Sequence, residues 1–293
     1  MELGYVGLGN MGGALNRRLM RERKMRVYDL NPAAVERHVS EGAAPTQDLV
    51  SLGAACDMVM TCLPTSDHVR AAIFASGGLA ENMRPGTIIA DMTTGDPNAT
   101  RAMAAELAAR NITLIDAPVS GGPHGADAGT IAIMVGAPDA IFAKVRPVFE
   151  VISPNIFHCG DVGTGHVVKL VNNVILAGIR TVTFEAVAMG MKNGLTLETI
   201  ATVLAKGSAR SSVTEGALPK LVAGDKSVSF TLGLMHKDVR LATQIGAESG
   251  APMPMAGLVR ETFQTALNEL GSDQDVNAMV HLFERQSAVK IVD

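Results

Sequence analysis

The segment Gly7-Leu8-Gly9-Asn10-Met11-Gly12 decides the fold of the first part of the chain. It follows an apolar stretch at 2–6 and opens a helical pattern over 10–23, and a second apolar stretch follows at 25–29. In such a strand–turn–helix, the first glycine permits a tight turn and the second lets a pyrophosphate approach the backbone. The third lets the helix pack closely on the sheet. The segment therefore predicts a dinucleotide-binding unit, with residues 7–12 in contact with the cofactor.

Asp29 ends the second predicted strand, 22 residues after Gly7 (29 − 7 = 22). An acidic side chain at this place can bind the ribose hydroxyls of the adenosine half of a dinucleotide. The following Leu30-Asn31-Pro32 offers no arginine for a 2′-phosphate, so the pattern favours NAD over NADP. Asp29 could instead cap a helix that begins near Pro32, and the sequence leaves that alternative open.

Strands and helices continue to alternate as far as residue 159. We expect strands at 57–63, 87–91, 112–116, 131–135 and 155–159, with a helix ending near 74 and helices at 96–110 and 139–150. Continuous apolar strands separated by helices predict a doubly wound parallel sheet of the Rossmann type, and hence an α/β fold. Ligands gather at the carboxyl ends of such strands. The candidates there to contact the cofactor are Leu63, Pro64, Thr65, His68 and Thr94, although His68 could equally be a solvated histidine.

A group of small residues follows the predicted strand 112–116. Ser120, Gly121 and Gly122 would expose backbone amides and one hydroxyl, which can hold a carboxylate by short hydrogen bonds. These three residues are therefore candidates to bind substrate. The alternative is a glycine-rich turn without a ligand.

From Gly163 the alternation stops and an all-α pattern begins. We expect helices at 164–192, 196–205, 211–222, 230–249, 254–270 and 273–288, and thus two domains, 1–162 and 163–293. Lys169 and Asn173 are four residues apart inside an apolar run, so they share one face of the first helix. A lysine there either reaches solvent or is held for chemistry. Lys237 and Asp238 form another charged group, which alone would indicate a surface pair.

Bulk composition excludes several classes of protein. The formal net charge of −4, the 3% of aromatic residues and the absence of tryptophan give no nucleic-acid footprint. The start of the chain lacks a signal-peptide pattern, and no run reaches 18 uninterrupted apolar residues, so we expect no membrane span. Cys56, Cys62 and Cys159 show no metal or disulfide spacing and indicate reduced, buried thiols of a cytoplasmic protein. The histidines lack ligand spacing, so no metal site is expected.

Four motifs stand in order along the chain: Gly7–Gly12, Asp116–Gly122, Gly163–Asn173 and Lys237-Asp238. Together they resemble the β-hydroxyacid dehydrogenase family, and most closely its 3-hydroxyisobutyrate dehydrogenase branch, which is related to 6-phosphogluconate dehydrogenase. The resemblance covers essentially the whole chain. It implies a Rossmann-type domain, a helical domain, and an active site in the cleft between them.

The resemblance also implies roles for individual residues. Lys169 would be the catalytic acid/base; Ser120, Gly121, Gly122 and Asn173 would bind substrate; Lys237 would reach both cofactor and substrate; and Leu63, Pro64 and Thr94 would contact the dinucleotide. Three places depart from the family pattern, one of them the Gly13-Ala-Leu-Asn-Arg-Arg segment, which lacks the usual Pro-Met after the third glycine. His68 stands where asparagine is common, and Pro123-His124 is unusual for this branch, so His124 could alter substrate preference or simply lie in a loop.

The implied reaction is reversible hydride transfer between NAD and a short β-hydroxy acid. An unperturbed lysine, with a pKa of about 10.4, is too basic to act as a base near neutrality. We expect burial and the charge of Lys237 to lower that pKa. Other substrates on the same scaffold stay open: tartronate, succinic or sulfonated semialdehydes, serine, and threonate, with Arg210 available for a second anionic group. A non-catalytic dinucleotide-binding module is a further alternative. We expect a homodimer or homotetramer.

Overall fold

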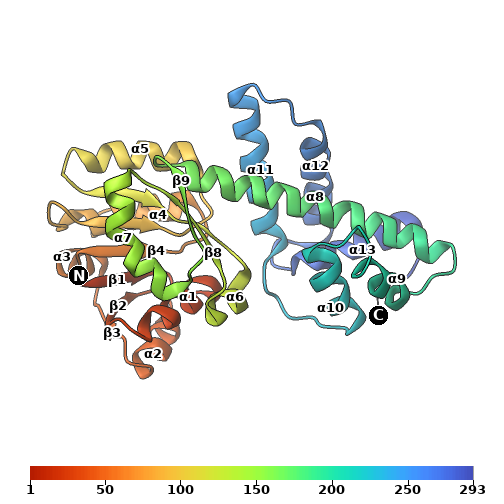
Figure 1. Cartoon of the computed structure of the whole chain (residues 1–293), viewed down its shortest axis with the longest axis horizontal. Helices are drawn as coiled ribbons and strands as arrows, with labels where there is room; N and C mark the ends of the chain where they lie inside the picture. Colours follow the sequence, from red (N-terminus) through yellow and green to blue (C-terminus); the bar gives the residue numbers. More distant parts are fainter. Residues whose placement is uncertain (293) are drawn as a thin grey trace. The chain divides into compact units, whose positions relative to one another are not determined.

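The computed structural model describes residues 1–292 and divides the chain into two compact units, Met1–Lys169 and Leu170–Asp293 (Figure 1). The division falls inside the long helix α8 (Thr164–Lys192), seven residues after the expected boundary at 162/163 (169 − 162 = 7). Each unit has its own buried core. A single continuous helix therefore supplies residues to both units.

The first unit is built on one nine-stranded sheet. Its strands are β1 (Leu3–Val6), β2 (Met25–Tyr28), β3 (Ala44–Pro45), β4 (Met58–Thr61), β5 (Ile88–Asp91), β6 (Thr113–Asp116), β7 (Val119–Ser120), β8 (Ala132–Gly136) and β9 (Ile156–Gly160). They run in the order β3-β2-β1-β4-β5-β6-β8-β7, with β9 paired to β8. The strands from β3 to β6 are parallel, and β8 is antiparallel to β6 and β7. The chain reverses direction across the sheet between β1 and β4, the place where dinucleotides bind in this fold.

Helices cover both faces of this sheet (Figure 1). They are α1 (Asn10–Met20), α2 (Pro32–Ser40), α3 (Leu49–Ala55), α4 (Ser66–Phe74), α5 (Pro97–Ala108), α6 (Gly122–Ala128) and α7 (Asp139–Ile152), with a 3-10 turn η1 (Leu79–Glu81). Successive strand residues point to opposite faces. In β5, for example, Ile88 and Ala90 pack in the core with α1 and α7, and Ile89 packs with α3, α4 and α5. Burial on both faces explains the continuous apolar runs of the strands.

Most expected elements of the first unit are present. Residues 122–128, for which no helix was expected, form α6. Pro123 stands in the first turn of α6, where its missing amide costs no helical hydrogen bond. Arg17 of α1 also forms an ion pair of 3.0 Å with Asp127 of α6. Packing against α1 therefore overrides the low helix propensity of the glycines.

The second unit is helical, as the sequence predicts. It contains most of α8 together with α9 (Leu197–Leu204), α10 (Leu218–Val222), α11 (Leu232–Ser249), α12 (Pro254–Leu270) and α13 (Val280–Ser287). Their apolar faces meet in one core, in which Phe184 of α8 and Phe283 of α13 make an edge-on ring contact with centroids 6.5 Å apart. The expected helix 211–222 is present, with a π-helical turn η2 (Val213–Ala217) that runs directly into α10. Pro219 cannot donate to the preceding turn, which accounts for this irregularity. The expected helix 273–288 likewise begins as a 3-10 turn, η3 (Val276–Met279).

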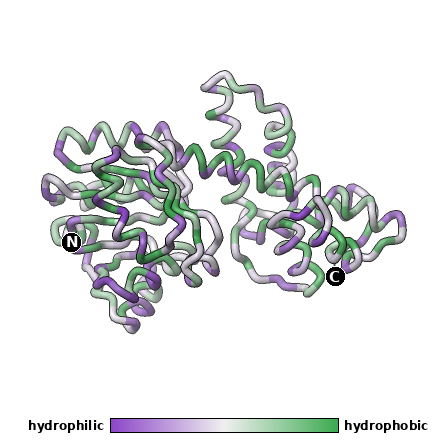
Figure 2. Tube along the Cα trace, viewed as in Figure 1, coloured by the Kyte–Doolittle hydropathy of each residue, from purple (hydrophilic) through white to green (hydrophobic). Residues whose placement is uncertain are grey.

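Helix α8 is unusually apolar for a helix with so much exposed surface (Figure 2). Its most apolar 18-residue window has a mean hydropathy of 1.5 and is only 33% buried. By length and composition it is the one helix in the described chain that could cross a membrane, and one such helix is weak evidence of a span. Core helices of soluble proteins meet the same criterion, and α8 carries five buried polar side chains, His166, Lys169, Asn173, Arg180 and Thr183.

Candidate active site

The glycine loop between β1 and α1 has the shape that a pyrophosphate requires. Gly7 adopts a positive φ of 94°, and a Cβ on Gly12 would lie 2.0 Å from the Gly7 carbonyl oxygen, so neither position accepts a larger residue. A Cβ on Gly9 would meet no described atom within 4 Å. No side chain of the described chain caps the start of α1, and its first turn has no acidic residue. The loop therefore fits the cofactor expected for Gly7–Gly12.

Asp29 is oriented by two backbone amides. Its Oδ2 accepts a hydrogen bond from the Leu8 amide at 2.5 Å, and its Oδ1 accepts one from Asn31 at 2.7 Å. The cap of α2 is Asn31, whose side chain accepts a bond from the Ala33 amide, so the alternative reading of Asp29 as the cap is wrong. Asp29 instead joins the glycine loop to the end of β2.

The loops after β4 and β5 are joined to each other. The Leu63 amide donates to the Thr93 hydroxyl at 3.0 Å, which places the expected contact residues Leu63, Pro64 and Thr94 on adjoining loops at one edge of the sheet. His68 lies exposed in the first turn of α4, where its Nδ1 is 2.7 Å from the Thr65 hydroxyl. The structure therefore supplies a local partner for His68.

Ser120 ends β7, and Gly121 and Gly122 follow it with positive φ angles of 137° and 68°. Both glycines are exposed, and Ser120 is half-buried. His124 lies exposed on the next turn, in α6. The segment thus presents the small, open surface on which the carboxylate interpretation depends.

Asp116 holds the start of α8 from a distance of about fifty residues, a role that the sequence did not reveal. Its two carboxylate oxygens accept the backbone amides of Gly163 and His166, at 2.6 Å and 2.7 Å. It is fully buried. Burial raises the pKa of this carboxyl, while the His166 ring and the two amides oppose that rise. The carboxylate therefore acts as a cap on the first turn of α8.

The glycines of the Gly163-Thr-Gly165 motif allow this docking. Gly163 has a φ of 92°. A Cβ on Gly165 would lie 2.3 Å from the Met134 carbonyl oxygen and 2.9 Å from Asp116 Oδ2. The start of α8 thus rests directly on β6 and β8. Lys169 follows one turn later and is buried, which contradicts the solvent-reaching alternative for this lysine.

The second unit holds a buried polar group around Asp238 of α11. Asp238 Oδ2 accepts the Asn173 side-chain amide at 2.6 Å, and Asp238 Oδ1 lies 3.1 Å from Lys237 Nζ. Asp238 is fully buried and the Lys237 side chain is 14% exposed, so the alternative of a surface pair is wrong. The adjacent positions of Lys237 and Asp238 in the sequence did not predict that Asp238 also binds Asn173. Arg210, by contrast, is exposed and lies 3.5 Å from Glu215.

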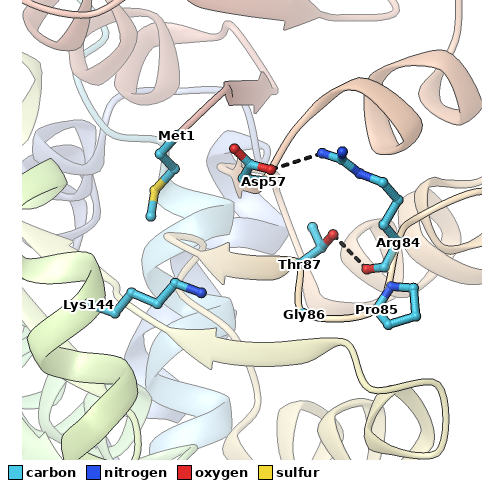
Figure 3. A pocket seen from close by; sticks show the side chains of 7 residues that line it. All are labelled: Met1, Asp57, Arg84, Pro85, Gly86, Thr87 and Lys144. Atoms are coloured by element: carbon cyan, nitrogen blue, oxygen red, sulfur yellow. Dashed lines mark hydrogen bonds and ion pairs between the residues drawn. The ribbon is translucent and has the colours of Figure 1, made fainter.

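A separate hollow of about 310 Å³ lies at the opposite edge of the sheet (Figure 3). It is lined by Met1, Asp57, Arg84, Pro85, Gly86, Thr87 and Lys144. Arg84 points at Asp57, at 2.9 Å, and the Thr87 hydroxyl donates to the Arg84 carbonyl. Apart from Lys144 of α7, these residues precede β1, β4 and β5, whereas the cofactor contacts expected in the first unit follow strands. The hollow contains none of the predicted site residues.

Fold and site together define a nicotinamide-dinucleotide-dependent dehydrogenase, and comparison with known proteins agrees. Residues 2–160 match the family described as the NAD-binding domain of 6-phosphogluconate dehydrogenase. Residues 163–283 match the family described as NAD-binding of NADP-dependent 3-hydroxyisobutyrate dehydrogenase.

Individual relatives span nearly the whole chain. A 2-(hydroxymethyl)glutarate dehydrogenase from Eubacterium barkeri is 36% identical, over 99% of this chain and 97% of the relative. An NAD-dependent L-serine dehydrogenase from Pseudomonas aeruginosa is 32% identical, over 97% of this chain and 98% of the relative. The crystal structure of a 3-hydroxyisobutyrate dehydrogenase from Salmonella typhimurium has a TM-score of 0.88 and 27% identity, over 96% and 99%. The chain belongs to the β-hydroxyacid dehydrogenase family.

Proposed function

We propose that this dehydrogenase oxidises a short acid of the form HO–CH₂–CH(R)–COO⁻ to its semialdehyde with NAD, and that Lys169 exchanges the hydroxyl proton. The observation that carries the proposal is a buried lysine one turn beyond a helix start that Asp116 fixes to the sheet. Fixed geometry of this kind is what an acid/base group requires.

Each proposed residue has a distinct task. Ser120, Gly121 and Gly122 bind the substrate carboxylate, and Asn173 and Lys237 contribute further contacts. NAD, when bound, supplies the hydride acceptor. The hydride leaves the hydroxyl-bearing carbon while the neutral amine of Lys169 takes the hydroxyl proton, so the alcohol loses two hydrogens and two electrons. In reduction the Lys169 ammonium returns the proton.

The chemistry of the relatives supports this substrate class. 3-Hydroxyisobutyrate, serine and 2-(hydroxymethyl)glutarate share the HO–CH₂–CH–COO⁻ core and differ only in R, which is methyl, ammonium or carboxyethyl. The shared core presents the same hydroxyl and carboxylate to the enzyme. The group R then determines which member of the class is preferred.

A substrate panel tests the proposal directly. Purified protein is offered acids with these three R groups and threonate with NAD or NADP, and succinic semialdehyde with NADH or NADPH, and the absorbance of the reduced nicotinamide is followed in each assay. We expect turnover of at least one HO–CH₂–CH(R)–COO⁻ acid. Cofactor binding without turnover of any member would contradict the proposal and favour a binding module.

We also propose a preference for NAD, supported by the oriented carboxylate of Asp29 and the absence of a following arginine. Asp29→Ser combined with Leu30→Arg removes a charge that repels a 2′-phosphate and adds one that attracts it. We expect the ratio of kcat/KM for NAD to that for NADP to fall by about 100-fold, equivalent to roughly 2.7 kcal/mol. Leu30→Arg alone is the matched control. An unchanged ratio in the double variant would show that Asp29 does not read the ribose.

We further propose that the protein is a homo-oligomer that associates through the exposed face of α8. The apolar residues on that face are Val168, Val171, Ile175, Val182 and Met189. Four of them recur every seven residues, the repeat by which two helices pack along a seam. Glu185 is the one charged residue on this exposed side between positions 168 and 189. A second copy of the same helix supplies a matching apolar partner.

Ile175→Glu tests this association, because Ile175 is 57% exposed near the middle of the face. A charge there should stay solvated in a monomer but lose its hydration in the oligomer. We expect the dissociation constant, measured by analytical ultracentrifugation, to rise at least 100-fold. Val203→Glu, at an exposed valine of α9, is the control and should leave it unchanged. Equal association of both variants would exclude this face.

A further inference from the structure

Two buried carboxylates lie side by side at the carboxyl ends of adjacent strands. Asp91 of β5 and Asp116 of β6 are register partners, and both are fully buried. Asp116 is satisfied by the two amides of α8. Asp91 Oδ1 accepts hydrogen bonds from the Thr61 hydroxyl at 2.9 Å and from the Thr93 amide at 3.0 Å. Two adjacent carboxylates away from water need a compensating cation.

His166 of α8 is placed to supply that charge. Its ring is fully buried, and Nε2 lies 3.6 Å from Asp91 Oδ2. Within residues 1–292, neither ring nitrogen of His166 nor Asp91 Oδ2 has a hydrogen-bond partner. If the imidazole were neutral, burying these three atoms without hydrogen bonds would cost free energy. The attraction between an imidazolium and the Asp91 carboxylate that faces it offsets that cost.

The ring also contacts the loop after β5. A Cβ on Gly95 would lie 3.1 Å from His166 Nε2 and 2.8 Å from the Ser66 hydroxyl. His166 therefore packs beside Gly95, the residue that follows the expected cofactor contact Thr94. On α8 it stands three residues before Lys169, so the two side chains are neighbours on the helix surface.

We propose that His166 and Asp91 form a buried charge pair that positions the first turn of α8 and sets the electrostatic environment of Lys169. This rests on the proposed role of Lys169. Other charged groups facing this turn are Asp116 from β6 and Arg101 of α5, whose Nε donates to the Val162 carbonyl. The variants below leave both unchanged. His166 is a positioning residue, because it acts through Lys169.

The pH dependence of kcat distinguishes this role from simple packing. His166→Gln leaves the charge of the Asp91 carboxylate uncompensated, which favours the ammonium form of Lys169. The limb of the kcat profile that is assigned to titration of Lys169 should therefore move to higher pH. Asp91→Asn leaves the imidazolium uncompensated, so the limb should move to lower pH. Each shift should be about one pH unit. The double variant should return to within a few tenths of a unit of the wild type.

A surface pair of the same separation provides the control. His158 Nδ1 lies 3.6 Å from Asp139 Oδ1, but the Asp139 side chain is fully exposed. His158→Gln and Asp139→Asn should leave the limb in place. The charge pair would be overturned if the Lys169 limb did not move in His166→Gln. It would also be overturned if His166→Gln and Asp91→Asn moved the limb in the same direction. If Asp91→Asn does not fold, His166→Gln still decides, since its limb must move to higher pH with the KM for NAD unchanged. Lys169→Ala separates this outcome from failure of the proposed function, because full activity in that variant removes Lys169 itself from the reaction.

Discussion

Replacing Lys169 by alanine is expected to lower kcat by about 10³-fold while leaving the dissociation constant for NAD unchanged. The substitution removes the proposed proton acceptor but alters no residue of the glycine loop or of the Asp29 bonds. Single-turnover absorbance of the reduced nicotinamide measures the hydride step. Binding of NAD is measured separately, by the loss of fluorescence as NAD displaces the reduced dinucleotide from the protein.

Two further variants sharpen this result. Lys169→Arg keeps the positive charge but cannot release a proton in the working pH range, so it should be nearly as inactive as alanine. Lys192→Ala, at the exposed end of the same helix, removes a lysine that donates to the Ser287 carbonyl and should retain full activity. Turnover of Lys169→Arg near the wild-type rate would mean that Lys169 provides charge rather than proton transfer.

Among substitutions that add one methyl group to α8, Gly165→Ala is expected to destabilise the protein most. Its Cβ would meet the Met134 carbonyl oxygen at 2.3 Å, Asp116 Oδ2 at 2.9 Å and the Gly136 amide nitrogen at 3.0 Å. These atoms belong to the sheet and to the cap of the helix, so none can move independently. We expect a loss of about 3 kcal/mol or more in the free energy of unfolding of the first unit, with a parallel loss of kcat.

Gly178→Ala makes the same chemical change further along the same helix. There the nearest described atom is Val259 Cγ2, at an ordinary contact distance of 3.8 Å. Alanine should stabilise the helix by up to about 1 kcal/mol, because glycine has the lower helix propensity. Urea denaturation followed by circular dichroism compares the two variants. Equal stability would show that the start of α8 is free to shift.

Much of the fold follows from local pattern. Some signals depend only on residues close together in the sequence: the glycine loop, the apolar strands and the capping residues. The elements β1, α1 and β2 lie where these signals indicate. Asp96 likewise caps α5 through the Asn98 amide, as its place before Pro97 predicts. The two-residue strands β3 and β7 are too short to produce a periodic signal.

The features that escaped prediction depend on contacts distant in sequence. Asp116 caps a helix that begins 48 residues later (164 − 116 = 48), although caps normally act within one turn. Asp238 is 65 residues from Asn173. The helix α6 forms despite its glycines because α1 packs against it. In each case tertiary structure decides what local propensity leaves open.

The division of the chain inside α8 has a consequence for how such enzymes diversify. The boundary between the compact units falls after Lys169, four residues before Asn173. A crossover at this point would inherit the dinucleotide site and the proposed proton-transfer lysine from one parent, and the Asn173, Lys237 and Asp238 group from the other. Because the junction is a regular helical turn, two parents need only share its helical register. We expect exchange of the helical half at 169/170 to keep the glycine loop, Asp29 and Lys169 together in the half from one parent.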